Sequence, residues 1–207
     1  MTIDSKDMLN SILSSISNID YVKTKDIPNI NLYMDQVTTF MEEQFASTKR
    51  YETDKILTKT MINNYAKNNL LPPPVKKKYS KEHILAMIFI YYFKNILSIK
   101  DIETMLAPIT ENYFDSDKEF NIDSIYEEVF KLEKSRIDAV QKDVARSYTK
   151  SLDCFSDIPD LSEEELEKLR TFAFICSLSF DVYIKKHIIE KLIDDMPEPE
   201  HHKKTKK

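Results

Sequence analysis

Apolar residues recur at spacings of three and four along most of the chain, which is the pattern of amphipathic α-helices. Residues 5–19 place one apolar stripe on a single face, formed by Met8, Leu9, Ile12, Leu13, Ile16 and Ile19. Residues 33–46 repeat the pattern with Met34, Val37, Phe40, Met41 and Phe45. The periodicity predicts an all-α protein.

A short helix is predicted to begin after Thr58, whose side chain is a favourable N-cap. Its apolar positions, Ile62 and Tyr65, would face inward. Because the chain contains no glycine, we expect Asn69 to adopt the left-handed conformation that ends this helix. The prolines at residues 72–74 then forbid helix and favour an extended path.

The next two helices are predicted to begin at serines. Ser80 precedes a broad apolar stripe formed by Ile84, Leu85, Ile88, Phe89, Tyr92 and Phe93. Ser98 is followed three residues later by Asp101, which together form a variant capping box. Pro108 lacks a backbone donor and clashes with the preceding turn, so we expect it to end this helix.

The C-terminal half reads as two long helices. Residues 109–121 have the composition of an acidic linker, and residues 122–155 form the first long helical pattern. Ser162 and Glu165 form a capping box for the second, which reaches about Met196. The polar residues 197–207 are expected to be a disordered tail.

The densest apolar stretch is Phe172 to Ile184, which has 13 residues and contains Asp181. A membrane span needs about 20 apolar residues, so this stretch predicts a buried core helix and no membrane anchor. Residues 1–20 carry Asp4, Asp7 and Asp20 without a long apolar core, so we expect no signal peptide and a cytoplasmic location.

The absence of glycine excludes several kinds of site. Phosphate-binding loops, dinucleotide-binding turns and nucleophile elbows all need glycine for a tight turn or a close backbone approach. The four histidines lack metal-ligand spacing, and no Ser, His and acid set is recognisable. We therefore expect no enzyme, no catalytic residues, no metal and no cofactor. Cys154 and Cys176 are expected as reduced thiols, with a disulfide between neighbouring helices as the alternative.

Positive charge is concentrated in one part of an acidic chain. The net charge is −5, yet residues 55–100 hold nine lysines and one acid, Glu82, which gives +8. The remaining residues therefore carry −13. A compact basic block of this kind is typical of a phosphate-binding module joined to a partner domain. The alternative is a chance run of solvated lysines.

The basic block supplies a candidate surface for double-stranded DNA. One face of the helix after Thr58 can be polar, so that it enters a major groove, where Asn pairs with adenine and Lys with guanine or phosphate. A stiff loop carrying three lysines would meet the phosphates beside the groove. The candidate residues are Thr58, Lys59, Asn63, Asn64, Lys67, Asn68, Lys76, Lys77, Lys78 and Tyr79. The asparagines could instead be capping or surface residues, and Tyr65 and Tyr79 could serve packing.

The same region resembles the winged-helix DNA-binding domain of MerR-type transcription factors. Where that family has Gly-Leu-Leu after its recognition helix, this chain has Asn69, Leu70 and Leu71. The end of the family's wing and the cap of its next helix resemble Lys78, Tyr79 and Ser80, and a later motif resembles Leu97, Ser98, Ile99 and Ile102. The resemblance implies a winged helix-turn-helix domain over residues 51–108. The usual Arg and Tyr of the reader helix are replaced by Asn63 and Asn64, so base preference does not carry over.

The stretch TKTMINNY, the three prolines and KKKY also resemble an uncharacterised domain-of-unknown-function family of Gram-positive bacteria. Together these patterns predict five parts. They are N-terminal helices packing on the reader domain (1–50), the winged-helix domain (51–108), a linker (109–121), a C-terminal helical domain for dimerisation or an effector (122–196), and the tail (197–207).

The sequence thus favours a homodimeric DNA-binding transcriptional regulator, because one short helix reads too few base pairs alone. Two alternatives stay open. One is an interaction protein on the same scaffold, since residues 55–107 contain no Arg, the commonest specific base reader. The other is a small-molecule sensor whose effector pocket lies among Phe172, Phe174, Phe180 and Tyr183, although these residues could simply form core.

Overall fold

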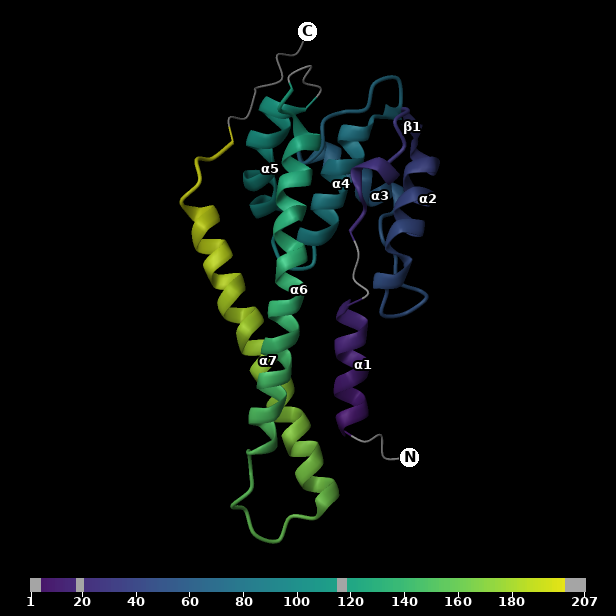
Figure 1. Ribbon diagram of the computed structural model, residues 1–207. Coiled ribbons are helices and arrows are strands. Elements are labelled where there is room, and N and C mark those ends of the chain that lie inside the picture. Colours follow the sequence, from purple (N-terminus) through teal and green to yellow (C-terminus); the bar gives the residue numbers. More distant parts are fainter. Residues whose placement is uncertain (1–4, 18–20, 115–118, 200–207) are drawn as a thin grey trace. The chain divides into compact units, whose positions relative to one another are not determined.

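The computed structural model describes residues 5–17, 21–114 and 119–199 and is mostly helical (Figure 1). Two short strands are also present among these residues. The elements are α1 (Ser5–Ser17), β1 (Leu32–Tyr33), α2 (Met34–Phe45), α3 (Lys59–Lys67), β2 (Lys78–Tyr79), α4 (Lys81–Phe93), α5 (Ile99–Tyr113), α6 (Ile122–Leu152) and α7 (Glu163–Asp194), with single 3₁₀ turns at Thr24–Asp26 and Ala46–Thr48. The prediction of an all-α protein is confirmed.

The predicted caps are confirmed at the helix starts. The Thr58 hydroxyl accepts a hydrogen bond from the Met61 amide at 3.2 Å. At α5 the Asp101 amide donates to the Ser98 hydroxyl at 3.1 Å, and the Ser98 amide donates back to the Asp101 carboxylate at 3.0 Å. Ser162 and Glu165 form the same reciprocal pair before α7. Each cap satisfies backbone donors that a helix start leaves unpaired.

The expectation that Pro108 ends a helix is wrong, because α5 continues through Pro108 to Tyr113. The helix persists although the proline removes one backbone donor. Side chains of the following turn bond to carbonyl oxygens of the turn before: Thr110 donates to Leu106 at 3.1 Å and Asn112 donates to Pro108 at 2.8 Å. Residues 109–113 of the predicted linker are therefore helical, and residues 115–118 lie outside the described residues.

The chain divides into two compact units. The larger unit comprises Val22–Glu128 with Ile189–Lys207, and the smaller unit comprises Met1–Tyr21 with Val129–Ile188. The central helix of the larger unit is α4, in which every residue from His83 to Tyr91 is buried. Burying each large aliphatic side chain contributes about 1.5–3 kcal/mol, so α4 is the main source of this unit's core.

The first and last segments of the larger unit's main stretch are joined by Tyr126. Its hydroxyl donates to the Val22 carbonyl at 2.7 Å, and its ring lies edge-on to Phe89 with centroids 5.5 Å apart. The side chain is 2% exposed, so this hydrogen bond is shielded from water. This hydrogen bond therefore joins the end of the Val22–Glu128 segment to its start.

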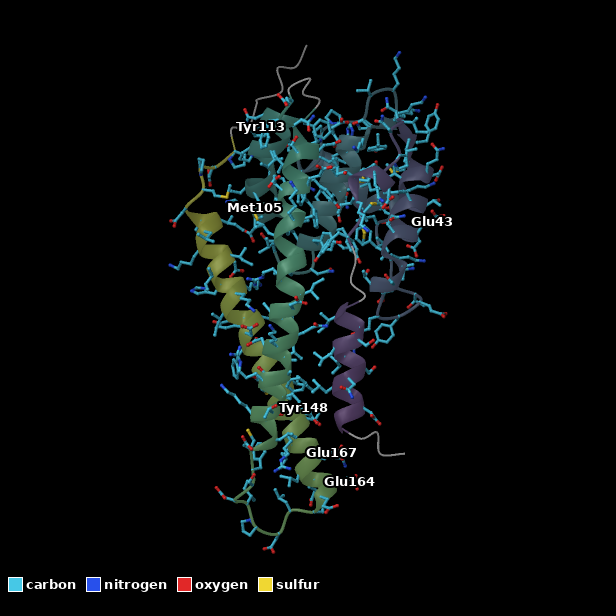
Figure 2. The ribbon with its side chains drawn as sticks, in the orientation of Figure 1. Glu43, Met105, Tyr113, Tyr148, Glu164 and Glu167 are labelled. Carbon is cyan, nitrogen blue, oxygen red and sulfur yellow. The ribbon has the colours of Figure 1, made fainter. Side chains whose placement is uncertain are left out.

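The smaller unit has a thin core shared by α1, α6 and α7. Its buried apolar cluster consists of Val144, Tyr148 and Phe174, and the rings of Tyr148 (labelled in Figure 2) and Phe174 meet edge-on at 5.4 Å. Partly buried apolar side chains pack on this cluster, namely Leu9, Ile12, Leu13, Ile16 and Leu178. The side-chain amide of Gln141 also donates to the Leu13 carbonyl at 3.1 Å, which holds α1 against α6.

The prediction that Phe172 to Ile184 is a buried core helix is wrong. Phe174 is buried, but Phe172, Phe180 and Tyr183 are 62%, 65% and 69% exposed. The reason is that apolar residues occupy the whole circumference of this part of α7, whereas α1 and α6 cover one side of it. No described helix has the combination of length and apolar sequence that a membrane crossing requires.

Stability should fall as the pH rises above about 10, because burial raises the pKa of Tyr65, Tyr79 and Tyr126 above the ordinary value of 10. In the unfolded chain these phenols lose protons near pH 10, while the folded protein keeps them. The unfolded state then binds fewer protons, and each such tyrosine lowers the free energy of unfolding by about 1.4 kcal/mol per pH unit.

Urea unfolding between about pH 8 and 11 measures this slope. Tyr126→Phe should make the slope shallower by one tyrosine's share. Equal slopes in wild type and Tyr126→Phe would contradict the assignment to buried tyrosine.

Candidate nucleic-acid interface

The helix α3 is short because both of its ends are capped. After the Thr58 cap, the Asn68 amide donates to Asn64 at 2.9 Å and the Leu70 amide donates back to Tyr65 at 3.0 Å. Asn69 has φ 58°, so the predicted left-handed asparagine is confirmed. This is a Schellman ending in which asparagine replaces the usual glycine.

One side of α3 is buried and the other is polar. Ile62 is fully buried and Tyr65 is 5% exposed, so these two side chains fix the rotation of the helix. Six of the polar positions are exposed, namely Lys59, Thr60, Asn63, Asn64, Lys67 and Asn68. At 100° per residue, Thr60, Asn63 and Lys67 lie near the centre of the exposed face. The helix therefore presents donors and acceptors of amide, hydroxyl and ammonium groups to solvent.

The segment after the prolines forms a β-hairpin with a two-residue turn. Lys76 and Lys77 form the turn, and Lys78 begins the strand β2. The amide of Val75 donates to the Lys78 carbonyl at 3.1 Å, and the amide of Lys78 donates to the Val75 carbonyl at 2.9 Å. Lys76 and Lys77, the two residues at the tip, have φ 50° and 64°. Positive φ at both central residues is the pattern of a type I′ turn, which Asn-Gly usually fills. The chain instead places two exposed lysines in this conformation.

The hairpin and α3 are both attached to the start of α2. Strand β2 pairs antiparallel with β1, with Tyr33 opposite Lys78 and Leu32 opposite Tyr79. The Lys78 ammonium lies 5.0 Å from the centre of the Tyr33 ring. Asp35, two residues after Tyr33, forms an ion pair with Lys59 at the start of α3. Lys59 and Lys78 thus lie at the same end of α2, although 19 positions separate them in the sequence.

The structure divides the basic block into lysines with different surroundings. Lys59 pairs with Asp35, and Lys81 pairs with Asp123. Lys94 donates to the Ile56 carbonyl at 2.6 Å and lies 5.0 Å from the Tyr91 ring, and burial lowers the pKa of its ammonium group. The charge available to a ligand is therefore smaller than the +8 of the segment. Lys67, Lys76 and Lys77 are exposed and carry the candidate surface's positive charge.

Three of the predicted site residues have packing or capping roles within the fold. Tyr79 is 3% exposed, so its ring is a packing residue and the expectation that it contacts DNA is corrected. The Thr58 hydroxyl is the α3 cap, and the Asn68 side chain donates to the Asn64 carbonyl at 2.8 Å. Five predicted residues lie exposed and without such a role among the described contacts: Asn63, Asn64, Lys67, Lys76 and Lys77.

Sequence reasoning missed Tyr33 and Asp35, which hold the two parts of the surface together. Their neighbours, Lys78 and Lys59, are distant in sequence, and the pairing of two-residue strands leaves no readable periodicity. Across the described residues, no group of three or more His, Cys, Asp or Glu side chains could hold a metal ion.

Relaxing the lysine turn should stabilise the protein. Replacing Lys76 with Asn and Lys77 with Gly should raise the free energy of unfolding by about 1 kcal/mol, because these residues accept positive φ more readily than lysine. Lys76→Ala with Lys77→Ala is the matched control, since it removes the charges but keeps both Cβ atoms. Thermal unfolding compares them, and equal melting temperatures would show that the turn is not strained.

The comparisons with known proteins give one match. The family model described as Domain of unknown function (DUF1836) matches residues 22–129, slightly more than half of the chain. This stretch contains β1, β2 and α2 to α5, and with them the whole candidate surface. No curated protein and no solved structure matches the chain.

Proposed function

The chain belongs to the DUF1836 family, a domain of unknown function, and from the exposed surface of that domain we propose that the protein is a DNA-binding transcriptional regulator. The observation that carries the proposal is the attachment of two different polar features to one end of α2. These are the polar face of α3 and the lysine hairpin. A groove-reading helix beside a phosphate-binding loop needs this combination.

The order of elements supports a winged helix-turn-helix of MerR type as the scaffold. A strand leads into α2, α3 follows, and a hairpin then returns to pair with the first strand before α4. In this proposal α3 is the reader helix and the turn at Lys76 and Lys77 is the tip of a short wing. Asn63, Asn64 and Lys67 would approach base edges in the major groove, where Asn suits adenine and Lys suits guanine.

Two copies would serve one operator. The helix α3 has two and a half turns, so its exposed side chains reach only a few base pairs. A two-fold dimer with readers about 34 Å apart would contact successive major grooves on one face of the duplex. This spacing would also multiply the specificity of each half-site.

A second function, a protein-interaction module on the same scaffold, is favoured by one observation. Asp35 neutralises Lys59 at the edge of the proposed DNA surface, and a carboxylate there would repel phosphate. By contrast, a sensor pocket among Phe172, Phe174, Phe180 and Tyr183 has less support, because three of these four side chains are mostly exposed and enclose nothing.

Fluorescence anisotropy with labelled duplex DNA tests the proposal. We expect wild-type protein to bind mixed-sequence duplex at about 50 mM salt and to lose affinity linearly in log salt. Asn63→Ala should leave this non-specific binding unchanged and reduce discrimination among genomic fragments. If wild-type protein binds no duplex even at low salt, the DNA proposal fails and the interaction module becomes the better reading.

A further inference from the structure

Between Thr171 and Ile184, α7 is apolar on two opposite sides. The one charged residue in this stretch is Asp181, whose carboxylate pairs with Lys185 one turn later. Helices in water normally keep one apolar side and expose a polar one. An α-helix that is apolar all round needs partners on more than one side.

The first side of α7 is accounted for within the chain. Phe174 is buried against Tyr148 of α6, and Leu178 packs on the same cluster. The apolar stripe of α1 is also used there. Among the described residues, the side chains of α1 and α6 that pack on this cluster therefore cover one face of α7.

The second side, which we call the outer face of α7, consists of Phe172, Ile175, Cys176, Ser179, Phe180, Val182 and Tyr183. At 100° per residue these positions fall within half of the helix circumference, on the side away from Phe174. Phe172, Ile175, Phe180, Val182 and Tyr183 are each at least 55% exposed. The outer face carries no charged side chain along about 17 Å of helix.

The size of this patch is at the upper end of what an isolated chain leaves in water. At about 200 Å² for a whole aromatic side chain, the exposed parts of Phe172, Phe180 and Tyr183 alone amount to roughly 400 Å². Monomeric proteins rarely expose contiguous apolar patches of more than a few hundred Å². With Ile175 and Val182 added, the exposed area of the outer face is roughly 600 Å², about three quarters of the about 800 Å² that each partner contributes to a standard interface.

We propose that the outer face of α7 is the surface on which two copies of this chain pair, through a two-fold axis that sets the α6–α7 hairpins of both copies into a four-helix bundle. A second copy fits the face better than an unrelated partner for two reasons. A patch without charge can meet itself without like-charge repulsion, and a two-fold contact matches the same patch on both sides. The smaller unit would also gain core, since Val144, Tyr148 and Phe174 form the buried apolar cluster among its described residues.

The inference deepens the proposed function by locating the surface that would pair two readers. It is measured without DNA, so a failure to bind DNA and a failure to dimerise are separate results.

Sedimentation equilibrium across nanomolar to micromolar concentrations is the direct test. Wild-type protein should be a dimer at micromolar concentration. Phe172→Glu with Tyr183→Glu should weaken dimerisation by at least about 100-fold, because each substitution occurs twice in a two-fold interface and buries charge in an apolar contact. Since both side chains are exposed in the single chain, the variant should keep its helical circular dichroism. Ile30→Glu, at another exposed apolar position, is the control and should remain dimeric.

Thiol labelling provides a second readout that needs no substitution in the outer face. Cys176 lies on this face and should react with a maleimide about tenfold more slowly when dilute protein is concentrated into the dimer. Cys154, which lies beyond the end of α6, should react at an unchanged rate. A monomeric wild-type protein at micromolar concentration would overturn the proposal. A dimer that survives the double glutamate substitution, with Cys176 still reactive, would overturn the choice of surface.

Discussion

Reversing the charge of the hairpin tip, with Lys76→Glu and Lys77→Glu, should lower the affinity for duplex DNA by about 100-fold at about 50 mM salt. In the proposed complex each of these lysines displaces one counterion from a phosphate. Losing two such contacts removes nearly two units from the slope of log affinity against log salt, which amounts to about two decades at this salt concentration. Repulsion between glutamate and phosphate would add to the loss.

The measurement is a salt series by fluorescence anisotropy on wild-type and variant proteins. Lys142→Glu with Lys150→Glu is the matched control, because it reverses two exposed lysines on α6, outside the candidate surface. The control should keep the wild-type salt slope and most of the affinity. If both double variants lose affinity equally, binding follows net charge alone and the hairpin has no particular role.

The variant Lys76→Asn with Lys77→Gly distinguishes the effect of charge on DNA affinity from the effect of backbone conformation in the hairpin. It removes the two positive charges without adding negative ones, and it is expected to be more stable than wild type. Its affinity for DNA should therefore lie between those of wild type and the glutamate variant. If this variant binds DNA more weakly and is more stable than wild type, the two lysines hold an unfavourable backbone conformation because their side chains are needed for binding.

Leu70→Ala should lower the free energy of unfolding of the larger unit by about 2–5 kcal/mol. Leu70 is 1% exposed, directly follows the left-handed Asn69, and donates the backbone bond that ends α3. Truncation removes the apolar transfer energy of the side chain and leaves a cavity beneath the end of α3. A loss of this size is a large share of the about 5–15 kcal/mol that stabilises a typical domain.

Urea unfolding followed by circular dichroism measures the change. Leu132→Ala is the matched control, because the same truncation at a 69% exposed position should cost less than about 0.5 kcal/mol. Hydrogen exchange of the α3 amides should also accelerate in Leu70→Ala, since opening of this helix would need less energy. Equal stability of the two variants would mean that Leu70 does not anchor α3.

Local signals in the sequence predicted the helix ends well. Thr58, Ser98 and Asn69 act within a few residues of themselves, by capping or by accepting positive φ, so their roles can be read from neighbouring letters. Pro108 shows the limit of the same reasoning. The helix continues past it, and the side chains of Thr110 and Asn112 donate to the carbonyl oxygens of Leu106 and Pro108 in the turn before.

The sequence predicts which side chains of the candidate surface are exposed, but not which distant segments contact them. Exposure of Asn63 and Lys67 follows from their spacing relative to Ile62 and Tyr65. Which lysines keep their charge available does not follow, because Asp35, Asp123 and the Ile56 carbonyl come from distant segments. Burial of Tyr79 likewise depends on the pairing of β2 with β1.

By itself, the sequence determined the helical class, the capped ends of α3, and a lysine-rich segment without glycine, because these depend on periodicity and short-range hydrogen bonds. Only the tertiary structure decided that Lys76 and Lys77 form a hairpin tip with positive φ and that the hairpin joins α3 at the start of α2. It also decided that the most apolar helix keeps an exposed outer face. Apolar composition indicates that a side chain should leave water, but the number of neighbouring helices sets how much of it one chain can cover.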